Sequence, residues 1–469
     1  MLIRSSLPFV LVCSTALAGC SMAPTYVRPE MPVPTELPAG GVYPPAASDA
    51  PDITRIGWRD FFTDPRLVQL IDTGLENNRD LRIAAANVMQ ARAQYRVQRA
   101  DRVPSVGVSG VASRSQPITS SPNVSLENYA LQGGFSAFEL DLFGRVANLS
   151  RAAQEQFFAS EEAQRATRIS LIAEIASAWL QMAADQDQLR ISQNALTSFQ
   201  ESLRLSEARF RIGVASELEA RQAETAFQSA RADIAALKSQ IAQDRNAINL
   251  LVGTQAPADL LPDALGTGGY TLDALPGEID SRVLLQRPDV LQAEHQLIAE
   301  NANIGAARAA FFPNISLTGL LGTASNALGG LFGSGSFSSS AEGALALPIF
   351  DGGRNKGNLD FAKASRELAL ANYEKAIQTA FREVADALAQ RGTIDEQLAA
   401  QSDRTVAAET TLRLSEARFE AGVDSYLVAL DAQRTAYSSQ QQLVDTRLAR
   451  ALNLINLYRS LGGGMSTTP

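Results

Sequence analysis

The sequence contains a single histidine and only two cysteines among its 469 residues. One histidine cannot build a multi-histidine metal site, and two cysteines cannot build a disulfide framework. The chain has 41 basic and 50 acidic residues, and it has no cluster of lysine or arginine. Because a nucleic-acid binder needs clustered positive charge to neutralise phosphates, the composition excludes that class of function.

Aromatic residues and long hydrophobic runs are also scarce. Aromatic residues make up 6% of the chain while hydrophobic residues make up 45%, so alanine and aliphatic side chains carry most of the apolar surface. This balance favours thin, closely packed helices over a thick globular core. The apolar run at residues 7–18 is too short for a spanning helix, which needs about 20 residues. Spanning strands give a weaker sequence signal and are not excluded.

The N-terminus has the features of a secretory leader. The apolar run ends in the letters LAGC at 17–20, which resemble a bacterial lipobox. In a lipobox the cysteine thiol receives a diacylglyceryl group before the leader is cleaved. We therefore predict a lipoprotein signal peptide at residues 1–19 and a covalent lipid on Cys20. The alternative is an ordinary signal peptide with a chance cysteine.

The segment behind this predicted anchor is rich in proline and alanine. Such a composition favours an extended chain over a packed element. We predict that residues 20–57 form a lipid-anchored N-terminal tether. Ser21 follows the predicted anchor, and serine at this place permits sorting of a lipoprotein to the outer membrane.

An internal repeat determines the organisation of the rest of the chain. Residues 203–210 read LRLSEARF, and residues 412–419 read LRLSEARF again, at an offset of 209. One offset that holds over a long stretch indicates a tandem duplication. We predict a first repeat at 58–265 and a second at 266–469. Each contains a helix, two strands, a long helix and a further helix, and the second ends in a C-terminal tail.

Each repeat contains a long stretch without helix breakers. Residues 146–212 include neither glycine nor proline, and a helix of that length extends about 100 Å. Apolar residues recur every seven positions along it, which indicates coiled-coil-like packing. A plain coiled-coil stalk is the alternative, but it leaves the strands unexplained.

Four segments show the alternation of a half-buried strand. In the second segment this alternation shifts near Phe138. The stretches 113–125 and 322–340, which lie between successive segments, are predicted to be loops. The four segments are 105–112, 128–141, 314–321 and 341–349.

These strands cannot span a membrane as a single chain. Four strands do not close a barrel, and an open sheet would leave unpaired backbone groups in the lipid. Three chains would supply twelve strands, an even number within the known range. We therefore predict a trimer, although closure alone also allows two or four chains.

Several long motifs of this chain resemble those of the outer membrane factors of Gram-negative tripartite pumps, the TolC-like group, in its OprM-like lipoprotein branch. The resemblance covers the chain from Cys20 onward. The matching motifs are WRDFFTDPRLVQLI at 58–71, ELDLFGR at 139–145, QRPDV at 286–290, ARAAFFPNISLTG at 307–319, LPIFDGGR at 347–354 and LYRSLGGG at 457–464.

The resemblance implies a mixed α and β membrane protein, a trimeric 12-stranded β-barrel continuous with a long periplasmic α-helical barrel. It implies the outer membrane as the location, with an extension into the periplasm. The implied partners are a periplasmic adaptor and an inner-membrane RND transporter, and the segments 22–65 and 254–285 are candidates to wrap the helical tunnel. The implied function is a passive exit duct for drugs and other small molecules, which is no enzyme and needs no cofactor beyond the lipid.

Other functions compete with this interpretation. A duct of the same architecture could serve protein secretion with an ABC exporter. A periplasmic coiled-coil scaffold and an envelope hydrolase are more distant alternatives. The paired carboxylates Glu139 and Asp141 could suggest a glycosidase, but they stand at a strand end, and we interpret them as structural. His295 has no second histidine near it and is interpreted as structural or exposed.

Two helix breaks at equivalent places are the most informative local features. Gly213–Val214 and Gly422–Val423 interrupt the long helices, and glycine there commonly supplies a left-handed cap. Ser216 and Ser425 are predicted to cap the outgoing helices. A helix-turn-helix corner alone would explain the breaks. The resemblance implies in addition that these turns are the periplasmic tips on which the adaptor docks.

The resemblance also assigns an aperture and a latch. Leu427 and Asp431 stand four residues apart, on one helix face. In the family a leucine and an aspartate at these places line the narrowest aperture, where rings of three leucines and three aspartates would obstruct and favour cations. The positions that match the family's latch are Glu219, Arg418 and Phe419. Because phenylalanine cannot donate a hydrogen bond, an ion pair between Arg418 and a carboxylate is the expected latch.

Overall fold

The computed structural model describes residues 21–44, 56–115, 126–266, 269–273 and 280–463. The chain divides into two compact units, which are described separately. The sheet unit comprises Met1–Glu30, Ala86–Glu162 and Gln292–Lys375, and the helical unit comprises Met31–Ala85, Ala163–Leu291 and Ala376–Pro469. The predicted signal peptide and Cys20 lie outside the described residues.

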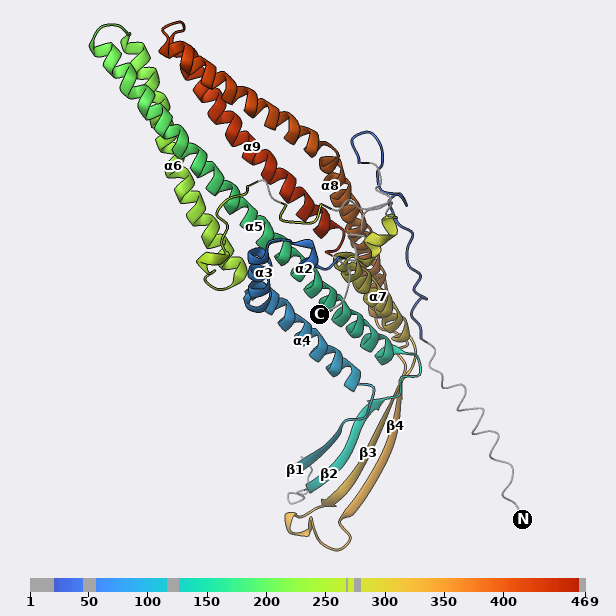
Figure 1. Cartoon of the computed structure of the whole chain (residues 1–469). Helices are drawn as coiled ribbons and strands as arrows, with labels where there is room; N and C mark the ends of the chain where they lie inside the picture. Colours follow the sequence, from blue (N-terminus) through green and yellow to red (C-terminus); the bar gives the residue numbers. More distant parts are fainter. Residues whose placement is uncertain (1–20, 45–55, 116–125, 267–268, 274–279, 464–469) are drawn as a thin grey trace. The chain divides into compact units, whose positions relative to one another are not determined.

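The sheet unit contains one antiparallel sheet in the order β1-β2-β3-β4 (Figure 1). β1 pairs with β2 from Val106↔Phe135 to Ser115↔Leu126, and β3 pairs with β4 from Asn314↔Ala346 to Thr323↔Phe337. The central pair, β2 and β3, joins the two sequence repeats. The strands are β1 (Val106–Ser115), β2 (Leu126–Glu139), β3 (Asn314–Ser325) and β4 (Phe337–Ala346).

The predicted strands are all present, but their bounds differ. β1, β3 and β4 each extend into the segments that were predicted to be loops, because the ladder is made by backbone groups, which serine and glycine also supply. β4 ends at Ala346, two residues before Pro348, which cannot donate to a ladder. The slip near Phe138 is confirmed, since the register of β2 against β3 shifts between Phe135 and Phe138.

The sheet has two open edges in the described chain. β1 pairs only with β2, and β4 only with β3. Every residue of β1 is exposed, and Val106 and Val108 are exposed by 79% and 77%. A sheet with apolar residues on an open edge strand is incomplete in water, so it needs a membrane, a further chain or both.

The helices of the two repeats correspond in length and position. α5 (Arg145–Arg211) and α8 (Arg354–Glu420) each contain 67 residues, and their first residues stand 209 apart. α4 (Arg79–Ala100) and α7 (Pro288–Ala309) each contain 22 residues. α6 (Glu217–Val252) and α9 (Tyr426–Ser460) contain 36 and 35 residues. Within the described part of the chain, no helix is both long and apolar enough to cross a bilayer.

The main core of the helical unit forms where short helices pack on α5. Trp179 of α5 is fully buried and donates a hydrogen bond from Nε1 to the carbonyl oxygen of Leu260 at 2.9 Å. Gly74 lies so close to α5 that a Cβ there would stand 2.4 Å from Ile175 Cδ1. The short elements are α2 (Trp58–Phe61), α3 (Pro65–Asn77), η2 (Ala258–Leu260) and η3 (Ser281–Gln286), and η4 (Leu328–Gly330) belongs to the sheet unit.

The N-terminal segment is extended, as predicted, but the prediction that it is not packed was wrong. In the sheet unit, Arg28 donates two hydrogen bonds of 2.7 Å to the carboxylate of Glu294 on α7. Asn301 donates to the carbonyl oxygen of Pro24 at 2.7 Å. Gly305 lies against Ala23, where a Cβ would stand 2.6 Å from the Ala23 nitrogen. Polar side chains along one face of α7 therefore bind a segment that has no secondary structure of its own.

Candidate functional site

The two helix turns share one backbone geometry. Gly213 and Gly422 adopt the left-handed region with φ of 76° and 72°. In the first turn the Val214 amide donates to the carbonyl oxygen of Arg209 at 3.0 Å, and in the second the Val423 amide donates to that of Arg418 at 2.9 Å. These bonds satisfy carbonyl groups that the helix end would leave unpaired. Both predicted helix breaks, at Gly213–Val214 and at Gly422–Val423, are therefore present.

The caps of the outgoing helices differ. The Ser216 hydroxyl accepts a hydrogen bond from the Glu219 amide at 3.3 Å, as predicted. Ser425 occupies the equivalent N-cap position, but its side chain makes no capping hydrogen bond. The prediction for Ser425 was therefore wrong in its chemistry, although it was right in its position.

An apolar cluster lies behind the second turn. Phe419 of α8 and Tyr426 of α9 are 8% and 3% exposed, and their ring centroids are 5.6 Å apart. Alanines of α6 complete the cluster, which allows the backbones to approach closely. The members are Phe199, Ala223, Ala226, Ala230, Phe419, Tyr426, Ala429 and Leu430.

The predicted aperture residues lie on the opposite, exposed face of α9. Leu427 is 54% exposed, and Asp431, one helical turn later, is also exposed. Leu430, between them in sequence, is fully buried in the cluster. This alternation fixes the rotation of α9, so that Leu427 and Asp431 face away from the other helices of their own chain.

The three predicted latch residues are not joined to one another. Arg418 forms its ion pair with Asp424, with Nε and Nη2 at 2.6 and 3.0 Å from the two carboxylate oxygens. The Arg418 guanidinium lowers the pKa of the Asp424 carboxyl through this hydrogen bond. Phe419 lies in the apolar cluster, and the Arg209 guanidinium stands 5.0 Å from its ring centroid. Arg418 thus pairs with a carboxylate of its own turn, and this ion pair does not link the two helix pairs as the expected latch would.

Polar contacts between α9 and the other helices were not predicted from the sequence. The Gln433 amide donates to Ser198 and Ser202 of α5 at 3.2 and 3.0 Å and to Glu416 of α8 at 3.0 Å. Polar residues recur every four positions on α9, at 433, 437, 441 and 445. This spacing could have predicted a polar face on the helix.

Tyr437 makes the next of these contacts, one turn along α9. Its hydroxyl lies 2.8 Å from the Ser192 hydroxyl of α5 and donates to Asp233 of α6 at 2.9 Å. Burial raises the pKa of Tyr437 to about 12, so it remains a neutral donor. Gln433 and Tyr437 together connect α9 to all three neighbouring long helices, and we call them the polar contacts of α9.

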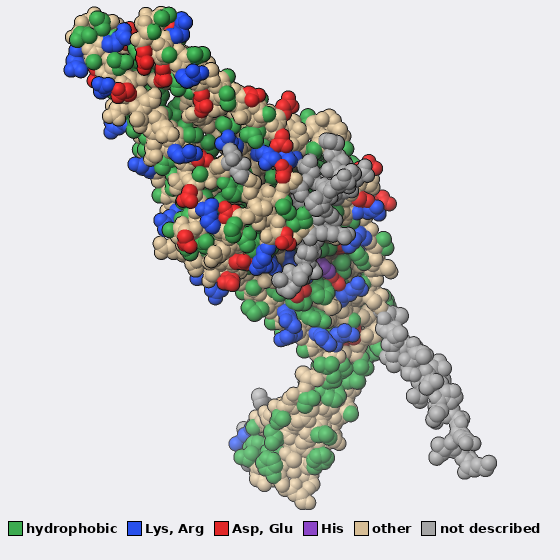
Figure 2. All heavy atoms as spheres, viewed as in Figure 1, with side chains coloured by type: hydrophobic (Ala, Val, Ile, Leu, Met, Phe, Trp, Pro, Cys, Tyr) green, Lys and Arg blue, Asp and Glu red, His purple; other side chains and the backbone are tan. Residues whose placement is uncertain are grey.

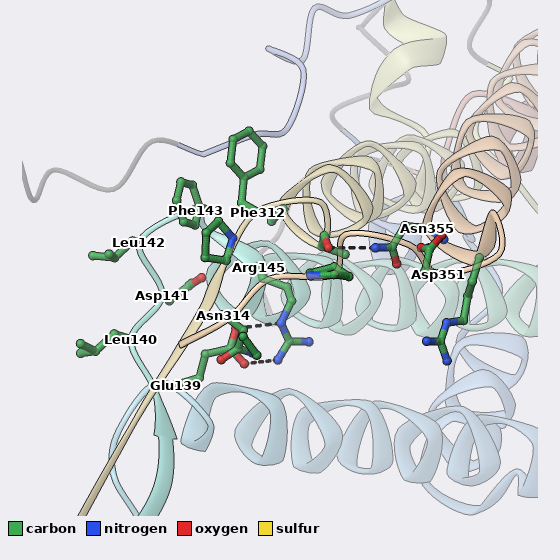
Figure 3. A pocket seen from close by; sticks show the side chains of 16 residues that line it. Glu139, Leu140, Asp141, Leu142, Phe143, Arg145, Phe312, Asn314, Asp351 and Asn355 are labelled. Atoms are coloured by element: carbon green, nitrogen blue, oxygen red, sulfur yellow. Dashed lines mark hydrogen bonds and ion pairs between the residues drawn. The ribbon is translucent and has the colours of Figure 1, made fainter. Parts of the chain in front are cut away.

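A cavity of about 300 Å³ lies in the sheet unit, where strands pass into long helices (Figure 3). Arg145, the first residue of α5, forms an ion pair with Glu139 at the end of β2. Asp141 accepts a hydrogen bond from the Ala147 amide at 2.6 Å, and Asp351 accepts one from the Asn355 amide at 2.8 Å. Each carboxylate is thus used to hold a helix start, which supports the structural interpretation of Glu139 and Asp141.

His295 also has a structural partner. Its Nδ1 lies 2.7 Å from a carboxylate oxygen of Glu155 on α5, and this hydrogen bond raises the pKa of the imidazole. Among the residues that the structure describes, no group of three or more potential metal ligands lies together.

Comparison with known proteins identifies the family. The model of the family described as outer membrane efflux protein matches residues 70–254 and again residues 280–463. The chain belongs to this family. The predicted family, the outer-membrane location and the efflux function are therefore confirmed. The family carries out transport, so the comparison places this chain among transport channels and not among enzymes.

The chain is similar over nearly its whole length to named efflux proteins. It is 44% identical over 464 residues to the probable efflux pump outer membrane protein TtgC of Pseudomonas putida, covering 98% of this chain and 96% of the relative. It is 41% identical over 463 residues to the cation efflux system protein CusC of Escherichia coli O157:H7, covering 98% of each.

A solved structure gives the same result for the fold. The crystal structure of a membrane protein from Pseudomonas aeruginosa matches with a TM-score of 0.86 and 42% identity, covering 95% of this chain and 98% of that chain. The predicted fold class is confirmed for the single chain: the protein has the fold of the outer-membrane channel proteins, with four strands and long helices.

Proposed function

We propose that three copies of this chain form the passive exit duct of a tripartite pump, and that a periplasmic adaptor and an inner-membrane RND transporter complete it. The open edges of β1 and β4 support this proposal, because pairing β1 of one copy with β4 of the next would close a twelve-stranded barrel without unpaired edges. Such a duct needs no catalytic residues, since the transporter supplies the energy.

The exposed face of α9 carries the proposal for the aperture. Leu427 and Asp431 face away from the chain's own apolar cluster and lack a packing partner there. Threefold symmetry would place three copies of each side chain around one axis. The leucine ring would obstruct the passage by size and dewetting, and the aspartate ring would favour cations over anions.

The ion pair of the second turn and the polar contacts of α9 would hold this aperture closed. Gln433 and Tyr437 tie α9 to α5, α6 and α8, and Arg418 ties the end of α8 to the turn before α9. Each contact is a single hydrogen bond or an exposed ion pair, and such contacts are individually weak. A docking partner could therefore break them one at a time. Glu219 keeps its predicted role only if it pairs with a neighbouring copy.

Both turns present apolar side chains that suit adaptor docking. Ile212, Val214 and Val423 are 75%, 61% and 61% exposed beside the two glycines. Figure 2 shows acidic and basic side chains around these same helix ends. An apolar centre with a charged rim is the composition of a protein-binding surface, and it would take the helical hairpin of an adaptor.

The path of the N-terminal segment supports a lipid on Cys20. Arg308 donates to the carbonyl oxygen of Met22 at 3.2 Å, and β3 begins shortly afterwards at Asn314. The described chain therefore begins against Arg308 near the end of α7, six residues before β3, and an acyl chain on Cys20 would enter the outer membrane there.

Single-channel conductance in a planar bilayer tests the aperture. The Leu427→Ala, Asp431→Ala double variant should raise the conductance by roughly twofold or more, because it widens the narrowest ring and removes its charge. The matched control is Leu218→Ala with Gln222→Ala, which changes the equivalent positions of α6 in the first repeat and should leave conductance unchanged. Equal conductance of the wild type and the α9 variant would refute the assignment.

Drug susceptibility separates the efflux duct from a protein-secretion duct. Deletion of the gene should sensitise the source cells to small toxic compounds without accumulation of a secreted protein in the periplasm. The opposite result would favour secretion with an ABC exporter.

A further inference from the structure

Two aspartates of adjacent helices are buried together in the helical unit, away from the aperture and the tips. Asp185 of α5 is 5% exposed, and Asp244 of α6 is 7% exposed. The two side chains lie within hydrogen-bonding contact of each other. Fully buried side chains stand close by on the same helices, among them Ala184 and Ile248. Two negative charges in such a place would repel strongly and would lack solvation.

The hydrogen bonds of the pair leave one oxygen of each carboxyl group without a donor. Gln181 donates to Asp185 Oδ1 at 3.2 Å, and Gln240 donates to Asp244 Oδ1 at 3.0 Å. Both bonds run between residues four apart on one helix, so each glutamine orients its own carboxyl group. The two Oδ2 atoms are buried and have no hydrogen-bond donor. A proton shared between the two carboxyl groups would provide a hydrogen bond for both Oδ2 atoms.

The charged groups closest to the pair do not supply a positive charge that could neutralise it. The charged groups with the largest effect on Asp185 are Asp244 from α6 and Asp445 from α9, and both are acidic. Asp445 accepts a hydrogen bond from Gln188 of α5 at 2.6 Å. Asp187 of α5 is engaged elsewhere, because it accepts from the Leu265 amide at 3.1 Å and pairs with Arg190. The groups facing the pair from α6 and α9 would therefore favour a bound proton.

We propose that Asp185 and Asp244 form a single proton-binding site that fastens α5 to α6. In the bound state one carboxyl group is neutral and its O–H donates to the other, ionised carboxylate. Release of the proton to water leaves two adjacent buried carboxylates, which push the two helices apart. The site goes beyond the duct function, since it makes the α5–α6 hairpin, which carries the first tip, respond to the pH of its surroundings.

Burial and the contact with Asp244 support this proposal by raising the pKa of Asp185 to about 7. A carboxyl group whose pKa is higher in the folded than in the unfolded protein binds more protons when folded. Its contribution to stability is therefore fully present in acid, and it is lost as the pH rises through the folded-state pKa.

The experiment compares thermal unfolding of the full chain, purified in detergent, between pH 5 and pH 9. The unfolding midpoint of the wild type should fall by a few degrees as the pH rises through neutrality. Asp185→Asn keeps the shape and donates a permanent hydrogen bond, so its midpoint should stay nearly constant over this range. The matched control Asp403→Asn removes an exposed aspartate of α8 and should keep the wild-type slope.

Infrared difference spectra give a second, direct measurement. The wild type at neutral pH should show a protonated carboxyl band that Asp185→Asn lacks and Asp403→Asn retains. If Asp185→Asn fails to assemble, Asp244→Asn replaces it, because an amide at either position can donate to the remaining carboxylate. An unchanged pH slope in the assembled variant, or an unchanged carboxyl band, would overturn the proposal.

Discussion

The two helix turns have nearly the same backbone and different side-chain environments. Gly213 and Gly422 have φ values within a few degrees of each other, and both turns close with the same pair of backbone hydrogen bonds. Yet Phe210 is 42% exposed beside the first turn, while its counterpart Phe419 is 8% exposed beside the second. The duplication preserved the turn and changed what surrounds it.

The difference comes from a few substitutions between the repeats. Where the first turn has Ala215 and Glu217, the second has Asp424 and Tyr426. Asp424 holds Arg418, and Tyr426 packs against Phe419. The first turn is thus an exposed corner, and the second is a corner fastened to the helices around it. In the proposed duct both turns would receive the adaptor, and the fastened second turn would in addition hold the aperture.

Truncation of the two phenylalanines should give the largest difference between the two turns. Phe419→Ala removes a buried ring from the apolar cluster and should destabilise the second turn by about 3 kcal/mol. Hydrogen exchange of amides at the end of α8 and the start of α9 should then accelerate about a hundredfold. The matched Phe210→Ala removes an exposed ring and should change exchange much less. Similar acceleration in both variants would show that the two turns are equally packed.

Substitution of the serines at the two N-cap positions should give an effect of intermediate size. Ser216→Ala removes a capping bond to the Glu219 amide and should destabilise the first turn of α6 by about 1 kcal/mol. Ser425 makes no such bond, so Ser425→Ala should leave exchange at the start of α9 unchanged. Hydrogen exchange of the two helix starts measures both effects. A loss of protection in Ser425→Ala would indicate a cap that forms in solution.

The smallest expected effect concerns the ion pair of the second turn. Asp424→Ala gives this turn the residue of the first, and it should raise local exchange by at most about fivefold, as expected for an exposed pair. Because Arg418 lowers the pKa of Asp424, the contribution of the pair is present above the ordinary aspartate pKa and lost as the pH falls through the lowered value. The variant and the wild type should therefore converge in acid.

The reciprocal change Ala215→Asp is the control for this pair. It places a carboxylate within reach of Arg209 and should slow exchange at the first turn. If Asp424→Ala still differed from the wild type in acid, the effect would come from packing and not from charge.

Much of the fold could be predicted because it depends on local patterns. The absence of glycine and proline over 146–212 predicted a helix that the structure places at Arg145–Arg211. The repeat placed the second long helix 209 residues later. Strand ends were predicted less well, since serine-rich and glycine-rich segments extend a ladder without any alternation of polarity.

The candidate site was predictable in position and less so in its contacts. Sequence located the glycine turns and the exposed pair Leu427 and Asp431. It did not show that Arg418 would pair with Asp424, because the sequence offers both Asp424 and Glu219 as carboxylate partners for this guanidinium. It also missed Gln433 and Tyr437, whose partners on α5 and α6 are more than 200 residues away.

The sequence alone determined the periodic elements of this protein: long helices, short strands and breaks at glycine, since these depend on residues close together in the chain. Only the tertiary structure decided which polar groups share a buried space. Asp185 and Asp244 stand 59 positions apart in the sequence. Their contact exists because α5 and α6 pack side by side behind one turn, and burial there makes a proton part of the structure.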